Sequence, residues 1–167
     1  MTIINRIGAT ASAHAHQHQA KSADYLAAQL KPLDDLVTLK MFGEDDSGSA
    51  SVGMRHGPVP ALTKESLTKA LGFRIADAGE MNERLFEFES VKNDPEFWTR
   101  FVETQEDPAV GEKAKALLTG KNVAEVVAMV VDEKDNRRPF AATAFLAARM
   151  NDGSLVYLRG TVGGMCF

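Results

Sequence analysis

Residues 123–131 read VAEVVAMVV, a run rich in β-branched residues. Such residues favour β-strands, and a run that is apolar on both faces is typical of a buried strand. A second run, LVYLRGTV at 155–162, follows Asn151-Asp152-Gly153, which is a strong turn signal. These stretches predict strands of a C-terminal antiparallel β-meander over about 123–162.

The segment 140–149 lies between these two strands and is rich in alanine. Alanine favours helix. Thr143, Phe145 and the position between two strands favour the middle strand of the meander instead. We expect the strand and keep the helix as the alternative.

Helices are predicted in the central part of the chain, over about 63–119. Thr63 is placed to begin one helix and Gly72 to end it. The pairs Asp94-Pro95 and Asp107-Pro108 each put a capping carboxylate before a proline that suits the first turn of a helix. The first of these two helices carries clustered aromatic residues, so we expect the core to centre there: Phe97, Trp98 and Phe101.

A further helix is predicted over 80–91, where apolar residues recur at helical spacing. A strand through Phe86 and Phe88 is the alternative. On a helix, Glu80, Glu83 and Glu87 would share one face opposite the apolar residues. This pattern is typical of a solvated face, and it also suits an interaction surface for a basic partner.

The N-terminal third carries weaker patterns. Residues 1–12 form a polar arm of small residues whose apolar anchors are Ile3, Ile4 and Ile7, and we expect this arm to be extended. Residues 13–31 predict a helix that stops at Lys31-Pro32. Alternating apolar and polar residues on both sides of a glycine-bounded stretch predict a β-hairpin over about 36–54.

The chain as a whole therefore predicts the α+β class, with the arm 1–12 followed by a single domain over 13–167. Its 167 residues, 44% hydrophobic and 25% charged, suit one ordinary globular domain. The lone Cys166 excludes a disulfide scaffold. The longest apolar runs are far shorter than the ~20 residues that a bilayer requires, so we expect no membrane contact and a cytoplasmic protein, or a particle assembled in the cytoplasm.

The net charge of −4 is unevenly distributed. From Asp77 to Asp107 there are ten acidic and three basic residues, whereas four arginines and one aspartate lie from Asn136 to the end. Opposed charges of this kind suit head-to-tail association of identical copies, or binding to a basic protein. A broad basic surface is missing, so we expect no direct binding to nucleic acid.

His14, His16 and His18 alternate along the chain and could present two or three imidazoles to a divalent metal ion. No Asp, Glu or Cys nearby completes a ligand set, so a solvated polar stretch is the favoured interpretation. No other cofactor is expected. If the histidines did bind metal, the protein could be a small metal-dependent hydrolase.

Arg55-His56-Gly57 resembles the Arg-His-Gly signature of the histidine phosphatases. The resemblance implies that His56 accepts a phosphoryl group. That family places the signature after its first strand and needs a second histidine later in the chain, and no histidine follows His56. We therefore favour Arg55 and His56 as exposed residues at the end of a hairpin, available for interaction.

These patterns contain no constellation of catalytic residues. The leading hypothesis is a non-enzymatic structural or assembly subunit of a homo-oligomeric complex, for instance a component of a virus or phage particle. Its main partners would be copies of itself. One alternative is an acidic binding or inhibitory protein for a basic partner that handles nucleic acid. The other is the metal-dependent enzyme that would use His14, His16 and His18.

Overall fold

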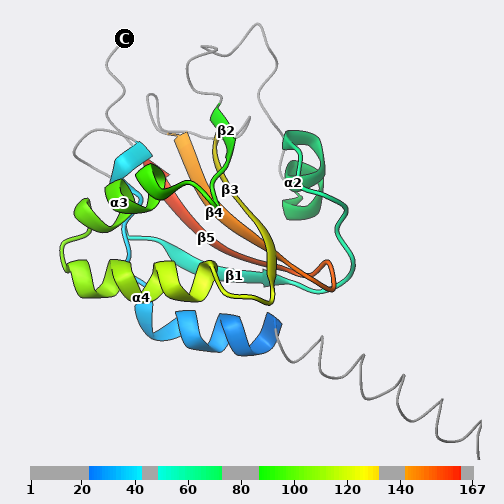
Figure 1. Ribbon diagram of the computed structural model, residues 1–167. Helices are drawn as coiled ribbons and strands as arrows, with labels where there is room; N and C mark the ends of the chain where they lie inside the picture. Colours follow the sequence, from blue (N-terminus) through cyan, green and yellow to red (C-terminus); the bar gives the residue numbers. More distant parts are fainter. Residues whose placement is uncertain (1–22, 43–48, 73–86, 132–141, 163–167) are drawn as a thin grey trace, which may run out of the picture.

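The computed structural model describes residues 23–42, 49–72, 87–131 and 142–162. These residues form an α+β fold around a five-stranded antiparallel sheet with the strand order β1-β5-β4-β3-β2 (Figure 1). The α+β prediction is confirmed. The strands are β1 (Ser51–Arg55), β2 (Glu87–Ser90), β3 (Val123–Val131), β4 (Ala142–Met150) and β5 (Leu155–Val162).

The helices lie against this sheet. A helical segment at 23–30 passes into the 3-10 turn Lys31–Leu33, as the Lys31-Pro32 stop signal predicts. The other helices are α2 (Lys64–Leu71), α3 (Pro95–Glu103) and α4 (Pro108–Leu118). Within the described ranges, no helix combines the length and the apolar character that crossing a bilayer requires.

The predicted C-terminal meander is confirmed. Strand β3 pairs with β4 and β4 with β5, both antiparallel, and Ala147 lies between Val127 and Tyr157 in the register. The alanine-rich segment therefore forms the middle strand. Ala144 and Ala148 are fully buried on the face that the segment 23–30, α3 and α4 cover, where small side chains let helices approach the sheet closely.

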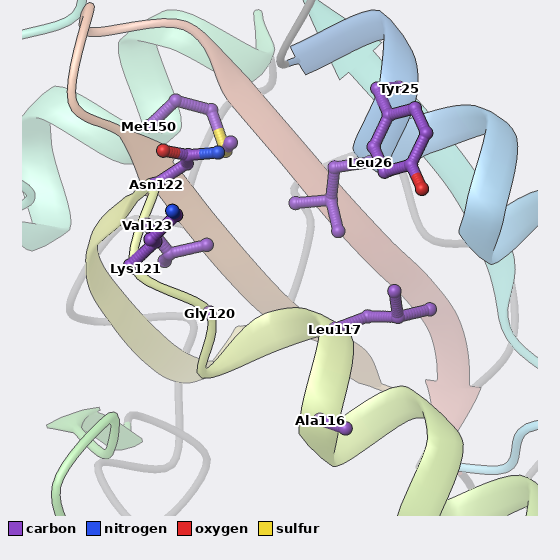
Figure 2. Close-up of a pocket in the computed structure, with 9 residues that line it drawn as sticks. All are labelled: Tyr25, Leu26, Ala116, Leu117, Gly120, Lys121, Asn122, Val123 and Met150. Carbon is purple, nitrogen blue, oxygen red and sulfur yellow. The ribbon is translucent and has the colours of Figure 1, made fainter.

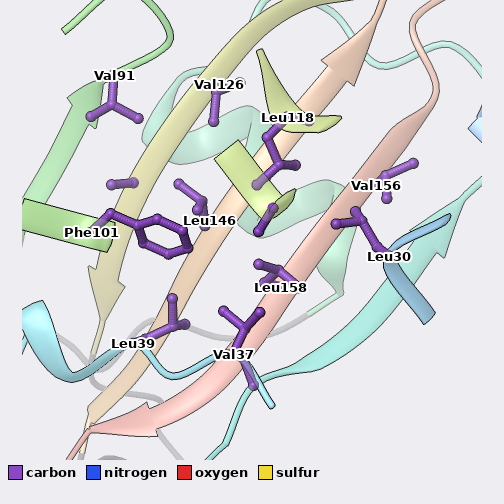
Figure 3. Close-up of a cluster of buried hydrophobic side chains, with 14 of the residues drawn as sticks. Leu30, Val37, Leu39, Val91, Phe101, Leu118, Val126, Leu146, Val156 and Leu158 are labelled. Atoms are coloured by element: carbon purple, nitrogen blue, oxygen red, sulfur yellow. The ribbon is translucent and has the colours of Figure 1, made fainter. Parts of the chain in front are cut away.

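The two faces of the sheet have separate cores, because side chains alternate along each strand. The segment 23–30, α3 and α4 pack on one face, which we call the three-helix face, and Figure 3 shows some of the side chains buried there. Its fully buried side chains include those of Leu30, Phe101, Leu118, Val126, Leu146 and Leu158. Helix α2 and the preceding loop cover the other face, the α2 face, with Leu67, Met129, Phe145 and Leu155 buried there.

The predicted helix ends are confirmed. Thr63 and Ser66 form a capping box at the start of α2, and Gly72 ends the helix with φ +71°. The Asp94 carboxylate accepts hydrogen bonds from two backbone N–H groups of α3, and Asp107 accepts one from Ala109 at the start of α4. The expected aromatic centre exists as well: Trp98 and Phe101 meet edge to face at 5.5 Å, although the core as a whole extends over both faces of the sheet.

The structure corrects the predicted hairpin at 36–54. Its first arm turns into a short 3-10 helix at Lys40–Phe42, and β1 pairs with β5 instead of with that arm. The two arms share one isolated bridge, between Thr38 and Ser49. The predicted hairpin tip lies outside the described residues.

The physical reason is that β1 pairs along its whole length with β5, while a side chain satisfies the backbone of Thr38 in the first arm. The Gln105 amide oxygen accepts from Thr38 N at 2.8 Å, and its Nε2 donates to Thr38 O at 2.9 Å. Gln105 is buried and also bonds the Phe101 carbonyl. These bonds satisfy the backbone N–H and C=O of Thr38, while Val37 O accepts from Ala50 N at 2.7 Å beside the isolated bridge.

The structure also corrects the helix predicted over 80–91. Residues 87–90 form strand β2, which pairs with β3, so the strand alternative holds there. Phe88 lies opposite Met129 and packs against the α2-face core. Residues 80–86 lie outside the described residues, as do the arm 1–12 and Cys166.

Candidate docking pocket

A surface pocket of about 210 Å³ lies where the helical segment 23–30 meets the end of α4 and the start of β3 (Figure 2). It is built from three separate parts of the chain. Its lining residues are Tyr25, Leu26, Ala116, Leu117, Gly120, Lys121, Asn122, Val123 and Met150.

The inner wall of the pocket is apolar and firmly placed. Leu26, Val123 and Met150 are each at most 5% exposed and belong to the core of the three-helix face. Val123 opens the buried strand β3, and Met150 closes β4 opposite it. Because these side chains are fixed by the core behind them, the wall does not depend on a ligand for its shape.

The rim is held by the turn that joins α4 to β3. Asn151 N donates to Asn122 O at 3.0 Å, and the Asn151 side-chain amide donates to Lys121 O at 3.2 Å. The turn between β4 and β5 therefore fixes the turn between α4 and β3. Lys121 and Asn122 are exposed, so they leave the interior of the pocket to apolar groups.

Tyr25 stands at the mouth of the pocket and is 66% exposed. It comes from the first described turn of the helical segment, next to the buried Leu26. Ala116 is exposed on α4 and lines the pocket from the side of that helix (Figure 2). An exposed aromatic ring beside an apolar cavity is an arrangement that protein interfaces favour.

Most of the predicted site residues lie elsewhere or outside the described residues. Five of them lie outside the described residues: His14, His16, His18, Glu80 and Glu83. Glu87 lies in strand β2, so the predicted helical face of three glutamates does not extend to it. Within the described ranges, no group of three or more His, Cys, Asp or Glu side chains is placed to hold a metal ion.

Arg55 and His56 are exposed at the end of β1, which pairs with β5 and is not an arm of the predicted hairpin. Arg55 Nη1 donates to the Ala70 carbonyl in the last turn of α2. His56 Nε2 lies 3.5 Å from Asp24 Oδ1, beside the helical segment. The two residues thus connect β1 with elements on both faces of the sheet, and the structure does not bring them to the pocket.

The acidic character of the middle of the chain is visible in the described part. Glu89, Glu96, Glu103 and Glu106 are all exposed around β2 and α3. Asp94 and Asp107 serve as helix caps instead. These exposed carboxylates form a solvated surface, whereas Glu80 and Glu83 of the predicted glutamate face lie outside the described residues.

Sequence reasoning did not find the pocket. Two signals for it are present in the sequence. Gly120 is a turn signal after the apolar positions of α4, and Tyr25 is an aromatic residue in a segment rich in alanine. The pocket itself depends on which residues the fold brings together. No protein-family model matches the chain, and comparison with curated proteins finds no similar sequence.

Proposed function

We propose that the protein is a non-enzymatic subunit of a homo-oligomeric assembly, and that the pocket beside Tyr25 is where one copy holds another. The observation that carries this proposal is the pairing of a preformed apolar cavity with a tyrosine that is 66% exposed. Aromatic anchors next to dry pockets supply much of the binding energy of protein interfaces.

The placement of polar groups at the rim of the pocket suits binding to a protein surface. Lys121 and Asn122 lie at the exposed rim, and the inner wall is made of Leu26, Val123 and Met150. An apolar centre surrounded by polar groups is the usual anatomy of an interface. Apolar walls of this kind recognise shape and hydrophobicity, which a neighbouring subunit can offer.

The charge distribution supports the choice of identical copies. The middle of the chain is strongly acidic and the C-terminal part mildly basic. When one molecule carries an acidic and a basic surface, the acidic surface of one copy attracts the basic surface of the next in a head-to-tail arrangement. Such contacts steer copies together, while the apolar pocket supplies the burial that holds them.

The test is the concentration dependence of the molecular mass, measured by sedimentation equilibrium. We expect the wild-type protein to self-associate. Ala116→Arg places a long charged side chain over the mouth of the pocket and should raise the dissociation constant at least tenfold. Ala109→Arg, an exposed alanine in the first turn of α4, is the matched control and should associate like the wild type.

A wild-type protein that stays monomeric at millimolar concentration would overturn the proposed function. An oligomer that Ala116→Arg leaves intact would keep the assembly and move the contact away from this pocket.

A further inference from the structure

We infer that the pocket of one copy receives isoleucine side chains from residues 1–12 of a second copy. This inference rests on the proposed function and names the occupant of the same site. It follows from the chemistry of the pocket, from its size, and from the place where the undescribed N-terminal stretch joins the described chain.

The pocket suits a branched aliphatic side chain. Its inner wall carries Leu26, Val123 and Met150, and the polar residues lie at the rim. Its volume of about 210 Å³ is larger than the ~150 Å³ apolar cavity that holds a benzene molecule. One or two isoleucine side chains fit a space of this size, and they bring no polar group that would lose its hydrogen bonds.

The N-terminal stretch contains branched aliphatic side chains and joins the described chain next to the pocket. The described residues begin at Ala23, two positions before Tyr25. The preceding 22 residues contain three isoleucines within five positions, Ile3, Ile4 and Ile7. Ile3 and Ile7 share one face of either a helix or a strand, because they are four residues apart. The stretch can therefore present two aliphatic side chains together.

The proposed self-association favours a second copy over the same chain as the source of the isoleucines. Tyr25 and Leu26, which line the pocket, stand near the start of the described helical segment 23–30. A copy that associates through this pocket therefore brings its own N-terminal stretch to the contact, because that stretch joins the described chain two positions before Tyr25.

The experiment is a complementation between two full-length variants. The first replaces the isoleucines (Ile3→Ser, Ile4→Ser and Ile7→Ser together) and keeps the pocket. The second, Ala116→Arg, blocks the pocket and keeps the isoleucines. Each variant alone should self-associate at least tenfold more weakly than the wild type. A 1:1 mixture should form mixed complexes, seen by native mass spectrometry, because the intact stretch of one variant enters the intact pocket of the other.

A second measurement covers the case in which a variant folds poorly. A synthetic peptide of residues 1–12 should dissociate the wild-type complex and change the fluorescence of the protein, since Tyr25 lies at the pocket. The same peptide with the three isoleucines replaced by serine is the control and should do neither.

The outcomes separate the inference from the proposed function. If the triple serine variant assembles like the wild type, this inference is wrong and the assembly stands. If both variants are monomeric and their mixture stays monomeric, the isoleucines dock within their own chain and the inference is again wrong. A monomeric wild-type protein would overturn the proposed function, and the inference with it.

Discussion

The two faces of the sheet are covered in different ways. On the three-helix face, the segment 23–30, α3 and α4 form one continuous apolar layer. On the α2 face, the described cover is one short helix and the loop before it, and hydrogen bonds to the sheet help to hold both. From this difference we expect apolar burial on the three-helix face to set the stability of the fold, and the α2 face to open locally.

The attachment of the α2 face uses a few specific polar contacts. Glu125 of β3 accepts a hydrogen bond from Leu62 N and lies 3.4 Å from Arg149 Nε of β4. Val59 N donates to Gly153 O at 2.8 Å. Contacts of this kind depend on single residues, so one substitution can loosen the cover without removing the sheet.

The largest expected effect is on the three-helix face. Phe101 is fully buried and meets Trp98 edge to face, so Phe101→Ala leaves a cavity and should lower the free energy of unfolding by about 3–5 kcal/mol. Leu67→Ala, at an equally buried position of α2, should cost about 2–3 kcal/mol. Urea unfolding measures both values, and Thr99→Ala on the exposed side of α3 should stay within about 0.5 kcal/mol of the wild type.

Amide hydrogen exchange then distinguishes local from global opening. In Leu67→Ala, exchange should accelerate over α2 while β3 and β4 stay protected. Faster exchange of β3 and β4 to the same extent in both variants would mean that the two faces unfold as one unit, and the contrast between them would be lost.

The second prediction concerns the polar attachment. Glu125→Ala leaves Leu62 N without its acceptor and Arg149 without its carboxylate, and both groups are partly shielded from water. The expected loss is about 1–3 kcal/mol, because unsatisfied groups keep their desolvation penalty. Urea unfolding gives the magnitude, and faster amide exchange at the start of α2 would locate it. Glu89→Ala removes an exposed carboxylate and is the matched control. Equal effects of the two substitutions would contradict the role of Glu125.

How much of this fold the sequence could predict depends on how local each signal is. The Asp94-Pro95 and Asp107-Pro108 pairs act within one helical turn, and both cap helices as predicted. The apolar run of β3 is long enough to indicate a buried strand without knowledge of its partners. Such features are readable because neighbouring residues alone determine them.

The features that the sequence did not reveal depend on distant partners. Strand β2 forms because Phe88 meets Met129 across the sheet, and helical spacing was present in the same residues. The backbone of Thr38 is satisfied by Gln105, which lies 67 positions later. The pocket joins Tyr25 to Leu117 and Met150. Local sequence patterns do not indicate which distant residues meet in the fold, so the candidate site could be identified only from the structure.

The smallest expected effect lies at the edge of the sheet, between the two faces. The Lys31 ammonium lies 3.0 Å from Asp34 Oδ2, and Val52 N of β1 donates to Asp34 Oδ1 at 2.7 Å. The hydrogen bond from Lys31, followed by the one from Val52, lowers the pKa of the Asp34 carboxyl below its ordinary value of 3.8. Asp34 thus caps the outer side of the edge strand with a charge.

The pH dependence follows from this lowered pKa. Because the folded protein binds the proton of Asp34 more weakly than the unfolded chain does, the charged carboxylate stabilises the fold above about pH 4. That contribution is lost as the pH falls through the folded pKa.

Asp34→Asn should therefore lower the free energy of unfolding by less than about 1 kcal/mol at pH 7, and its difference in stability from the wild type should shrink below about pH 4. Urea midpoints between pH 7 and pH 3 measure this, with the exposed neighbour Asp35→Asn as control. If the difference in stability between Asp34→Asn and the wild type stays constant across this pH range, Asp34 stabilises the fold through the geometry of its hydrogen bonds and not through its charge.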